Sequence, residues 1–146
     1  MIRPGTIADL PAIMRIRTSV TENHLSVEQM TEIGITIDSS AEEMTAGDLG
    51  CWVVMDGASI TGFSMADRRD GSIFALFMDA TYEGKGHGSA LLEACEAWLK
   101  QQGHAEARLT TGRDTAAFTF YRRRGWQETD EAAGHFAEDA VMKKQL

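Results

Sequence analysis

A glycine-rich turn constrains the fold of this chain more than any other stretch. Residues 82–89 read Tyr-Glu-Gly-Lys-Gly-His-Gly-Ser, with glycine at three alternate positions. The preceding residues 73–78 are apolar and aromatic, which predicts a buried strand. Residues 90–102 carry leucine, cysteine and tryptophan at helical spacing and place Glu93, Glu96 and Lys100 on the opposite, solvent-facing side. The turn is therefore expected to join a buried strand to the N-terminus of an amphipathic helix.

Such a turn has the geometry of a phosphate cradle. Alternating glycines let the backbone approach an anion and direct successive N–H groups toward it. The N-terminus of the following helix adds unpaired N–H donors and a partial positive charge. Lys85 places a full positive charge inside the turn. We therefore expect phosphate binding along residues 84–89.

Two familiar phosphate-binding motifs do not match this turn. A P-loop needs four residues between its glycines, followed by Lys and Ser or Thr, and this spacing is absent. A dinucleotide fingerprint needs glycine at the sixth position, which is Ser89 counted from Gly84 and Leu91 counted from Gly86. A turn that serves only close packing remains an alternative for three alternate glycines taken alone.

The length and composition of the chain limit its class. At 146 residues it is expected to form one domain, residues 1–146. No apolar run approaches the roughly 20 residues of a membrane span, and no signal-peptide pattern opens the chain, so we expect a soluble, cytoplasmic protein without a membrane partner. Cys51 and Cys95 lie in apolar patterns without a Cys-x-x-Cys motif, which predicts core positions and no metal site.

The charge of the chain bears on its partners. A formal net charge of −8 argues against nucleic-acid or anionic-membrane binding, which needs clustered Lys and Arg, and favours a neutral or cationic substrate. An ordinary solvated surface explains the acidity equally well. The basic cluster, residues 122–124, lies at an expected helix C-terminus and complements the helix dipole there. Contact with the phosphates of a bound nucleotide is a second role open to this cluster.

The N-terminal third reads as a short strand followed by helices. Residues 1–3 predict the strand, and Thr6 with Asp9 has the form of a capping box that opens the first helix. A second capping box begins at Ser26 and a weaker one at Ser40. Residues 26–46 are therefore expected to form a broken helix with a kink near residues 34–39.

The middle of the chain reads as an antiparallel meander. Residues 51–55 and 59–65 are strand-like runs joined at Asp56-Gly57, a strong hairpin signal. Residues 69–72 join the second run to the strand before the glycine turn in the same way. A Rossmann fold needs parallel strands, so this region counts against it.

The C-terminal third continues with a crossover. Residues 105–110 predict a strand parallel to its partner, because a helix connects the two. Asp114 or Thr115 is expected to cap a helix over residues 116–124. Two weaker strands are predicted at residues 126–129 and 137–143.

Two segments resemble a known family. The stretch Glu83-x-x-Gly86-x-Gly88 resembles motif A of the GNAT acetyltransferase superfamily, where Arg or Gln usually occupies the place of Glu83. A second stretch resembles motif B of the family, in which Asn is usual at the first position: Asp114-x-x-Ala117-x-x-Phe120-Tyr121-x-x-x-Gly125-Trp126. The resemblance covers essentially the whole chain. It implies an α+β fold of three α/β/α layers, with a mixed, mostly antiparallel central sheet of about seven strands and flanking helices.

The resemblance also implies a function. It implies an N-acetyltransferase that moves the acetyl group of acetyl-CoA to a primary amine of a small molecule, peptide or protein, by direct attack in a ternary complex. A non-catalytic acyl-CoA-binding regulatory module is the alternative, because Glu83 places a carboxylate near the pyrophosphate and Asp114 lacks an amide donor. A homodimer through the late strands is compatible with the pattern.

The resemblance assigns roles to individual residues. The Leu76 backbone N–H would stabilise the oxyanion, and Tyr121 would protonate the departing CoA thiolate unless it serves only as a core aromatic. The cofactor-binding residues would be Leu76, Phe77, Met78, Glu83, Gly84, Lys85, Gly86, His87, Gly88, Ser89, Asp114, Ala117 and Tyr121.

The acceptor would be recognised by the polar linker after the first helix. Arg17, Glu22 and Asn23 are the expected substrate-binding residues, although an exposed ion pair and a turn former explain them equally well. Glu22 is the candidate catalytic base that we assign, and His24, Asp67 and His135 are further candidates, none singled out by spacing.

Overall fold

The structure is a computed structural model that describes residues 1–19, 25–79, 86–131 and 139–146. Its described strands form one seven-stranded sheet in the order β1-β2-β3-β4-β5-β7-β6. Only β4 and β5 pair in parallel, which confirms the expected mixed, mostly antiparallel sheet. The strands are β1 (Ile2–Pro4), β2 (Leu49–Asp56), β3 (Ser59–Asp67), β4 (Ser72–Met78), β5 (Glu106–Gly112), β6 (Gln127–Glu128) and β7 (Asp139–Gln145).

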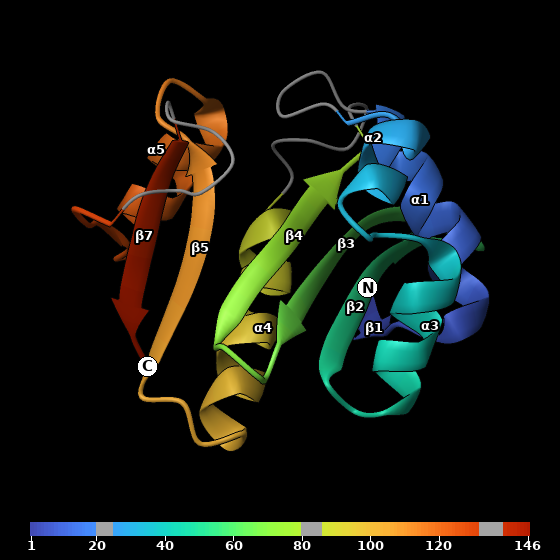
Figure 1. Ribbon diagram of the computed structural model, residues 1–146, viewed down its shortest axis with the longest axis horizontal. Coiled ribbons are helices and arrows are strands. Elements are labelled where there is room, and N and C mark those ends of the chain that lie inside the picture. The colour runs from blue at the N-terminus through green and yellow to red at the C-terminus, as the bar shows by residue number, and fades with distance from the viewer. Residues whose placement is uncertain (20–24, 80–85, 132–138) are drawn as a thin grey trace.

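Helices cover both faces of the sheet (Figure 1). Leu10, Ile13 and Ile16 of α1 pack on one face, where α2 and α3 also lie. Leu92, Cys95 and Leu99 of α4 pack on the other face together with α5. These are the three layers expected from the sequence. The helices are the 3₁₀ turn η1 (Ile7–Asp9), α1 (Leu10–Ser19), α2 (Val27–Glu32), α3 (Ile37–Thr45), α4 (His87–Gln101) and α5 (Ala116–Arg123).

The first helix begins as the capping box predicts. The Thr6 backbone N–H donates to Asp9 Oδ2 at 2.8 Å, and the chain enters α1 through η1. Arg3 of β1 donates to both carboxylate oxygens of Asp9, at 2.8 and 3.0 Å. The hydrogen bond from Arg3 is the largest cause, and with the bonds from Thr6 it lowers the pKa of Asp9 to about 2. The ion pair fixes α1 to the edge strand.

The region of the expected broken helix forms two helices. The prediction at Ser26 is confirmed, because its Oγ accepts from the Gln29 N–H at 3.1 Å. The prediction of a cap at Ser40 is wrong, because Ser40 lies inside α3. Thr36 caps α3 instead, and its Oγ1 accepts from the Ser39 N–H at 3.0 Å. Gly34 separates the two helices with a φ of +85°, which interrupts helical geometry.

The strands β2, β3 and β4 form the predicted meander. Gly57 has a φ of +61° in the first hairpin and Gly71 a φ of +75° in the second. Positive φ values are the reason that glycine occupies these turns. Cys51 of β2 and Cys95 of α4 are both buried, as expected, and burial raises the pKa of each thiol to about 12. Both cysteines therefore act as small apolar core residues.

β4 and β5 pair at one end and then separate. Ser72 and Arg108 are the one registered pair between them, and the Arg108 N–H donates to the Gly71 carbonyl at 3.0 Å. Figure 1 shows the two strands diverging toward the carboxyl end of β4. A bulge at Phe74 also bends β4, since its register with β3 shifts between Ala75 and Ile73. Beyond that bulge, the β5-facing edge of β4 has no partner strand among the described residues.

Glu96 departs from the expected solvent-facing position. Its side chain is 14% exposed and lies between α4 and the last strands. It accepts from Trp126 Nε1 at 3.1 Å and from Lys144 Nζ at 2.9 Å. Trp126, which is 2% exposed, thereby satisfies its indole N–H in the core. Helical periodicity predicts a solvent-facing Glu96, because periodicity within one helix does not reveal that Lys144 of β7 lies beside it.

Candidate functional site

The N-terminus of α4 lies inside the glycine turn. The helix begins at His87, three residues before the predicted start, so Gly86 is its N-cap and Gly88 lies in its first turn. Gly86 has a φ of +81°, a conformation that favours glycine. A Cβ atom at Gly86 would meet no atom of the described residues within 4 Å. Among the described residues, the space beside this helix N-terminus is therefore open, as an anion site requires.

α5 packs against this helix start. A Cβ atom at Gly88 would lie 3.4 Å from Cζ of Phe120, in direct van der Waals contact with the ring. Phe120 also packs against Tyr121 with ring centroids 5.3 Å apart. The absence of a side chain at Gly88 thus allows the aromatic residues of α5 to lie against the first turn of α4. The two segments singled out by sequence meet at this contact.

Arg124, the last residue of the basic cluster, is held at the same place. Its Nε donates to Ser89 Oγ at 2.8 Å, and its Nη1 donates to the Phe120 carbonyl at 3.0 Å. The guanidinium lies over the Phe120 ring, 3.7 Å from the centroid. Arg122 and Arg123 are exposed. In the sequence, the separation of Arg124 from Phe120 by one helical turn indicates that the two residues lie on the same side of a helix. It does not indicate the hydrogen bond to Ser89.

Tyr121 is nearly buried in the core on the α4 and α5 face. It is 7% exposed and packs edge-on against Trp126, with centroids 6.0 Å apart. Leu76 of β4 and Ala117 of α5 contact the same apolar cluster. Burial raises the pKa of the Tyr121 hydroxyl above its usual value, so the group stays protonated near pH 7 and is a weaker acid than a solvated tyrosine. The structure thus brings together three of the expected site residues.

Arg17 and Phe77 meet on the opposite face of β4. The guanidinium of Arg17 lies over the Phe77 ring, 4.3 Å from its centroid. Arg17 comes from the last turn of α1 and is half-buried. Burial lowers the pKa of Arg17 below its usual value, although an arginine remains charged near neutral pH. An expected acceptor-side residue therefore lies beside an expected cofactor-side residue.

Two other expected residues are not members of the apolar cluster that contains Tyr121. Asp114 is exposed two residues before α5, and Thr115 is the cap, since its Oγ1 accepts from the Phe118 N–H at 3.2 Å. Asp67 lies at the β3–β4 turn, at the far end of β4 from Met78, and pairs with Arg69 at 2.8 Å. That pairing lowers the pKa of Asp67. Its position argues against a role as catalytic base.

Several predictions cannot be compared with the structure. They fall on residues outside the described ranges: Glu22, Asn23, His24, Glu83, Gly84, Lys85 and His135.

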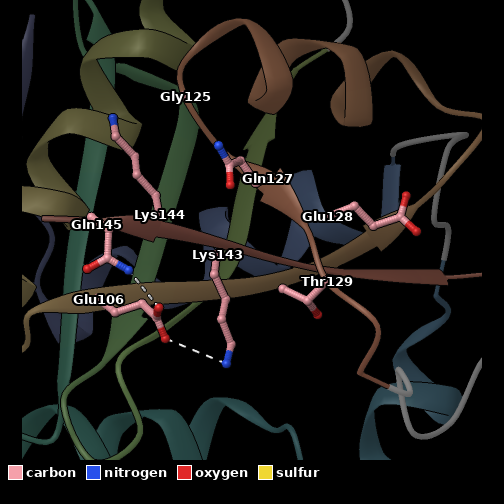
Figure 2. A pocket seen from close by; sticks show the side chains of 8 residues that line it. All are labelled: Glu106, Gly125, Gln127, Glu128, Thr129, Lys143, Lys144 and Gln145. Atoms are coloured by element: carbon pink, nitrogen blue, oxygen red, sulfur yellow. Dashed lines mark hydrogen bonds and ion pairs between the residues drawn. The ribbon is translucent and has the colours of Figure 1, made fainter.

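Two hollows in the surface lie away from these residues. The first, of about 440 Å³, is formed where β6, β7 and the start of β5 meet (Figure 2). Within it, Glu106 accepts from the Gln145 side-chain amide at 2.8 Å and lies 3.6 Å from Lys143 Nζ. Its other charged residues, Glu128 and Lys144, pair with Arg113 and Glu96 outside the hollow. The second, of about 530 Å³, is lined by Trp52 and Trp98 beside β2. Neither contains an expected site residue.

Two further kinds of feature are absent from the described parts of the chain. No helix there is long and apolar enough to span a membrane. No group of three or more His, Cys, Asp or Glu side chains there could hold a metal ion.

A comparison of the sequence with protein-family models identifies its family. The model of the acetyltransferase (GNAT) domain matches residues 20–140. The chain belongs to the GNAT acetyltransferase family. This confirms the family that the two motifs resemble. No curated protein matches the sequence of the chain.

Solved structures with the same fold come from several organisms. The PaiA N-acetyltransferase of Thermoplasma acidophilum, in complex with coenzyme A, is 20% identical with a TM-score of 0.81, covering 100% of this chain and 98% of that one. The ribosomal-protein-alanine N-acetyltransferase of Brucella melitensis is 19% identical, with a TM-score of 0.77 and coverage of 100% and 99%. A phosphinothricin acetyltransferase of Sinorhizobium meliloti, in complex with acetyl-CoA, is 18% identical, with a TM-score of 0.76 and coverage of 100% and 88%. At these identities the likeness shows the shared GNAT fold.

Proposed function

We propose that this GNAT protein is an N-acetyltransferase of one domain, residues 1–146, which transfers the acetyl group of acetyl-CoA to a primary amine. The observation that carries the proposal is the meeting of three features in the described parts of the chain: the edge of β4 that has no partner strand there, the open N-terminus of α4 and the aromatic face of α5. Family membership implies acyltransferase activity. Acetyl-CoA would supply the activated acyl group.

The residues at the helix start fit a phosphate-bearing ligand. The N–H groups of residues 84–89 would bind the pyrophosphate, with Gly86 and Gly88 leaving the space open and Lys85 adding charge. The Arg124 guanidinium donates a hydrogen bond to Ser89, so its positive charge lies beside the N–H groups that would bind the pyrophosphate. Two cations there would offset the carboxylate of Glu83.

The edge of β4 fits the rest of the cofactor. An extended arm with amide groups can add to an unpaired strand edge by backbone hydrogen bonds, as peptides do. Leu76, Phe77 and Met78 lie on the part of β4 where β5 has separated from it. The Leu76 N–H would then be the donor that stabilises negative charge on the carbonyl under attack. Asp114 and Ala117 would lie along the same arm.

Tyr121 would act as the proton donor to the departing thiolate. A tyrosine hydroxyl carries a proton at neutral pH, and burial keeps it in that form. The Tyr121 side chain and that of Leu76 belong to the same apolar cluster, which supports pairing these two residues in the proposal. We propose Arg17, Glu22 and Asn23 for the acceptor side, with Glu22 as the base. A cytoplasmic location and a homodimer belong to the proposal as well.

Release of CoA thiol distinguishes this function from a non-catalytic acyl-CoA-binding module. The purified protein is given acetyl-CoA and a panel of primary amines that contains amino acids, their amides, alkylamines and peptides, and free thiol is measured with a thiol reagent. An enzyme releases thiol in stoichiometry with acetylated amine above the rate of spontaneous hydrolysis. Binding of acetyl-CoA without amine-dependent release across the whole panel would favour the regulatory module.

A further inference from the structure

The C-terminal end of α5 holds the rings of Tyr121 and Trp126 together. Gly125 has a φ of +92°, and the helix closes with a bond from the Trp126 N–H to the Tyr121 carbonyl at 3.2 Å. The Gly125 N–H donates to the Arg122 carbonyl at 3.3 Å, which completes a Schellman motif. In this motif the residue after the glycine packs on the last turn of its helix. The Trp126 ring accordingly lies edge-on to the Tyr121 ring, with centroids 6.0 Å apart.

Glu96 of α4 fixes the Trp126 indole in turn. Trp126 is 2% exposed, so its indole N–H needs a partner inside the protein. Glu96 Oε2 accepts that N–H at 3.1 Å, and Oε1 accepts from Lys144 Nζ at 2.9 Å. Each carboxylate oxygen therefore has its own donor, and the carboxylate cannot rotate without losing one of them. Lys144 also offsets the negative charge of a side chain that is only 14% exposed.

These contacts connect Tyr121 to the proposed phosphate site. Glu96 lies on α4, the helix that begins at His87 beside the open space at Gly86. An α-helix rises about 1.5 Å per residue and keeps a fixed distance between its turns. The start of α4 would hold the phosphates of acetyl-CoA. Further along, the same helix holds the ring of the proposed proton donor through Glu96 and Trp126.

We propose that Glu96 and Trp126 are positioning residues for Tyr121, which hold its hydroxyl where the departing thiolate forms. This inference rests on the proposed function, in which Tyr121 is the proton donor. The proton passes from the Tyr121 oxygen to the CoA sulfur as the bond between that sulfur and the acetyl carbon breaks, and Glu96 and Trp126 take up none. A small displacement of a reacting group lowers the rate of the chemical step, so the network acts on kcat and not on cofactor affinity.

Glu96→Gln tests the network with little change of shape. The amide has one acceptor oxygen, so its NH₂ group must face either the Trp126 N–H or Lys144 Nζ, and both of these are donors. We expect kcat to fall about tenfold, while the acetyl-CoA affinity measured by calorimetry stays within about twofold of the wild type. Glu93→Gln, at an exposed position on the same helix, is the control and should change neither.

A second substitution should rescue the Glu96→Gln variant. Lys144→Met removes one of the two donors, so the amide oxygen of Glu96→Gln is free to accept from the Trp126 N–H. The double variant should therefore recover kcat to within about threefold of the wild type. A double variant as slow as Glu96→Gln alone would contradict the role of the indole hydrogen bond.

Tyr121→Phe decides whether the loss acts through the hydroxyl. In that background there is no hydroxyl to position, so Glu96→Gln should change kcat by less than about twofold. Trp126→Phe keeps a ring beside Tyr121 but lacks the N–H donor, and it should behave as Glu96→Gln does in both backgrounds. If Glu96→Gln lowers kcat by the same factor with and without the hydroxyl, the network is structural and the inference is overturned.

NMR of the protein without ligand reports the ring itself. The chain has two tyrosines, so tyrosine labelled with ¹³C at the ζ carbon gives two signals, which Tyr121→Phe assigns. Glu96→Gln leaves both aromatic rings intact, so a shifted or broadened Tyr121 signal reports a displaced ring. We expect this change in Glu96→Gln and not in Glu93→Gln. An unchanged Tyr121 signal in Glu96→Gln would overturn the inference.

Failure of the inference and failure of the proposed function give different results. Full kcat in Tyr121→Phe or in Glu96→Gln would overturn the inference, while acetyl transfer by the protein would stand. A wild-type protein that releases no thiol with any amine of the panel would overturn the proposed function, and the inference with it.

Discussion

Arg124 Nε donates a hydrogen bond to Ser89 Oγ at 2.8 Å and so joins the C-terminal end of α5 to the first turn of α4. The same guanidinium stacks on Phe120, which lies against Gly88. The glycine turn and the second motif are separated in the sequence, yet these contacts make them one surface. A ligand at the start of α4 would therefore lie within reach of a cation from α5.

The Arg124–Ser89 contact gives the first prediction. Arg124→Gln should weaken acetyl-CoA binding about tenfold, because a hydrogen bond to a charged group is lost. The loss should be larger at low than at high salt, since salt screens the attraction between the guanidinium and phosphate. Calorimetric titration at two salt concentrations measures both effects. Arg123→Gln removes an exposed arginine from the same helix and should change the affinity little; equal effects of the two variants would contradict a specific contact.

Removing the Tyr121 hydroxyl should affect activity without affecting stability. Tyr121→Phe keeps the ring and its packing in the core, so it should leave the free energy of unfolding unchanged within about 0.5 kcal/mol. The same change should lower kcat by about 100-fold if the hydroxyl is the general acid. Urea unfolding and steady-state kinetics on one preparation provide the two numbers. A variant as active as the wild type would reduce Tyr121 to a core aromatic.

The buried contacts of Glu96 predict an effect on stability. Glu96→Ala removes the acceptor of the Trp126 indole N–H and the partner of Lys144. A buried donor left without a partner costs about 1–3 kcal/mol, so the free energy of unfolding should fall by that amount. Glu93→Ala, at an exposed position on the same helix, is the control and should change it little. If urea unfolding shows no difference between these two variants, the bridge contributes nothing.

The Arg3–Asp9 pair predicts a dependence of stability on pH. The pKa of Asp9 is lowered to about 2 in the folded protein, below the value of about 3.9 in an unfolded chain. The stabilisation is therefore complete above about pH 4 and is lost as the pH falls toward 2. Asp9→Asn should be less stable than the wild type at pH 6, and the difference should shrink between pH 4 and pH 2.

Urea midpoints measured across that range test the prediction for Asp9. Asp130→Asn, an exposed position, should follow the wild type throughout. A difference between Asp9→Asn and the wild type that stays constant with pH would mean that the carboxylate charge is not what stabilises the helix start.

Local signals predicted most of the fold. The hairpin at Asp56-Gly57 and the cap at Ser26 depend on residues a few positions apart, so the sequence alone was sufficient to locate them. The predicted helix cap at Ser40 is wrong because Thr36 caps α3, with its Oγ1 accepting a hydrogen bond from the Ser39 N–H.

Contacts between distant elements could not be predicted. Helical periodicity predicts a solvent-facing Glu96, because its partners, Trp126 and Lys144, lie 30 and 48 residues later in the sequence. The hydrogen bond from Arg124 to Ser89 and the stacking of Arg17 on Phe77 likewise depend on how helices dock on the sheet. Motif spacing thus indicated where the site lies, while the side chains that complete it required the structure.

Acetyl-CoA binding to the wild type and to Gly86→Trp is the most direct test of the central claim. The indole would fill the open space at the helix start and block the cradle. Gly103→Trp is the matched control, because Gly103 also has a positive φ, of +98°, and open surroundings, but lies beyond the other end of α4. Calorimetry should give micromolar affinity, about −8 kcal/mol, for the wild type and Gly103→Trp, and no detectable binding for Gly86→Trp. Absence of binding by the wild type, or unchanged binding by Gly86→Trp, would contradict the account.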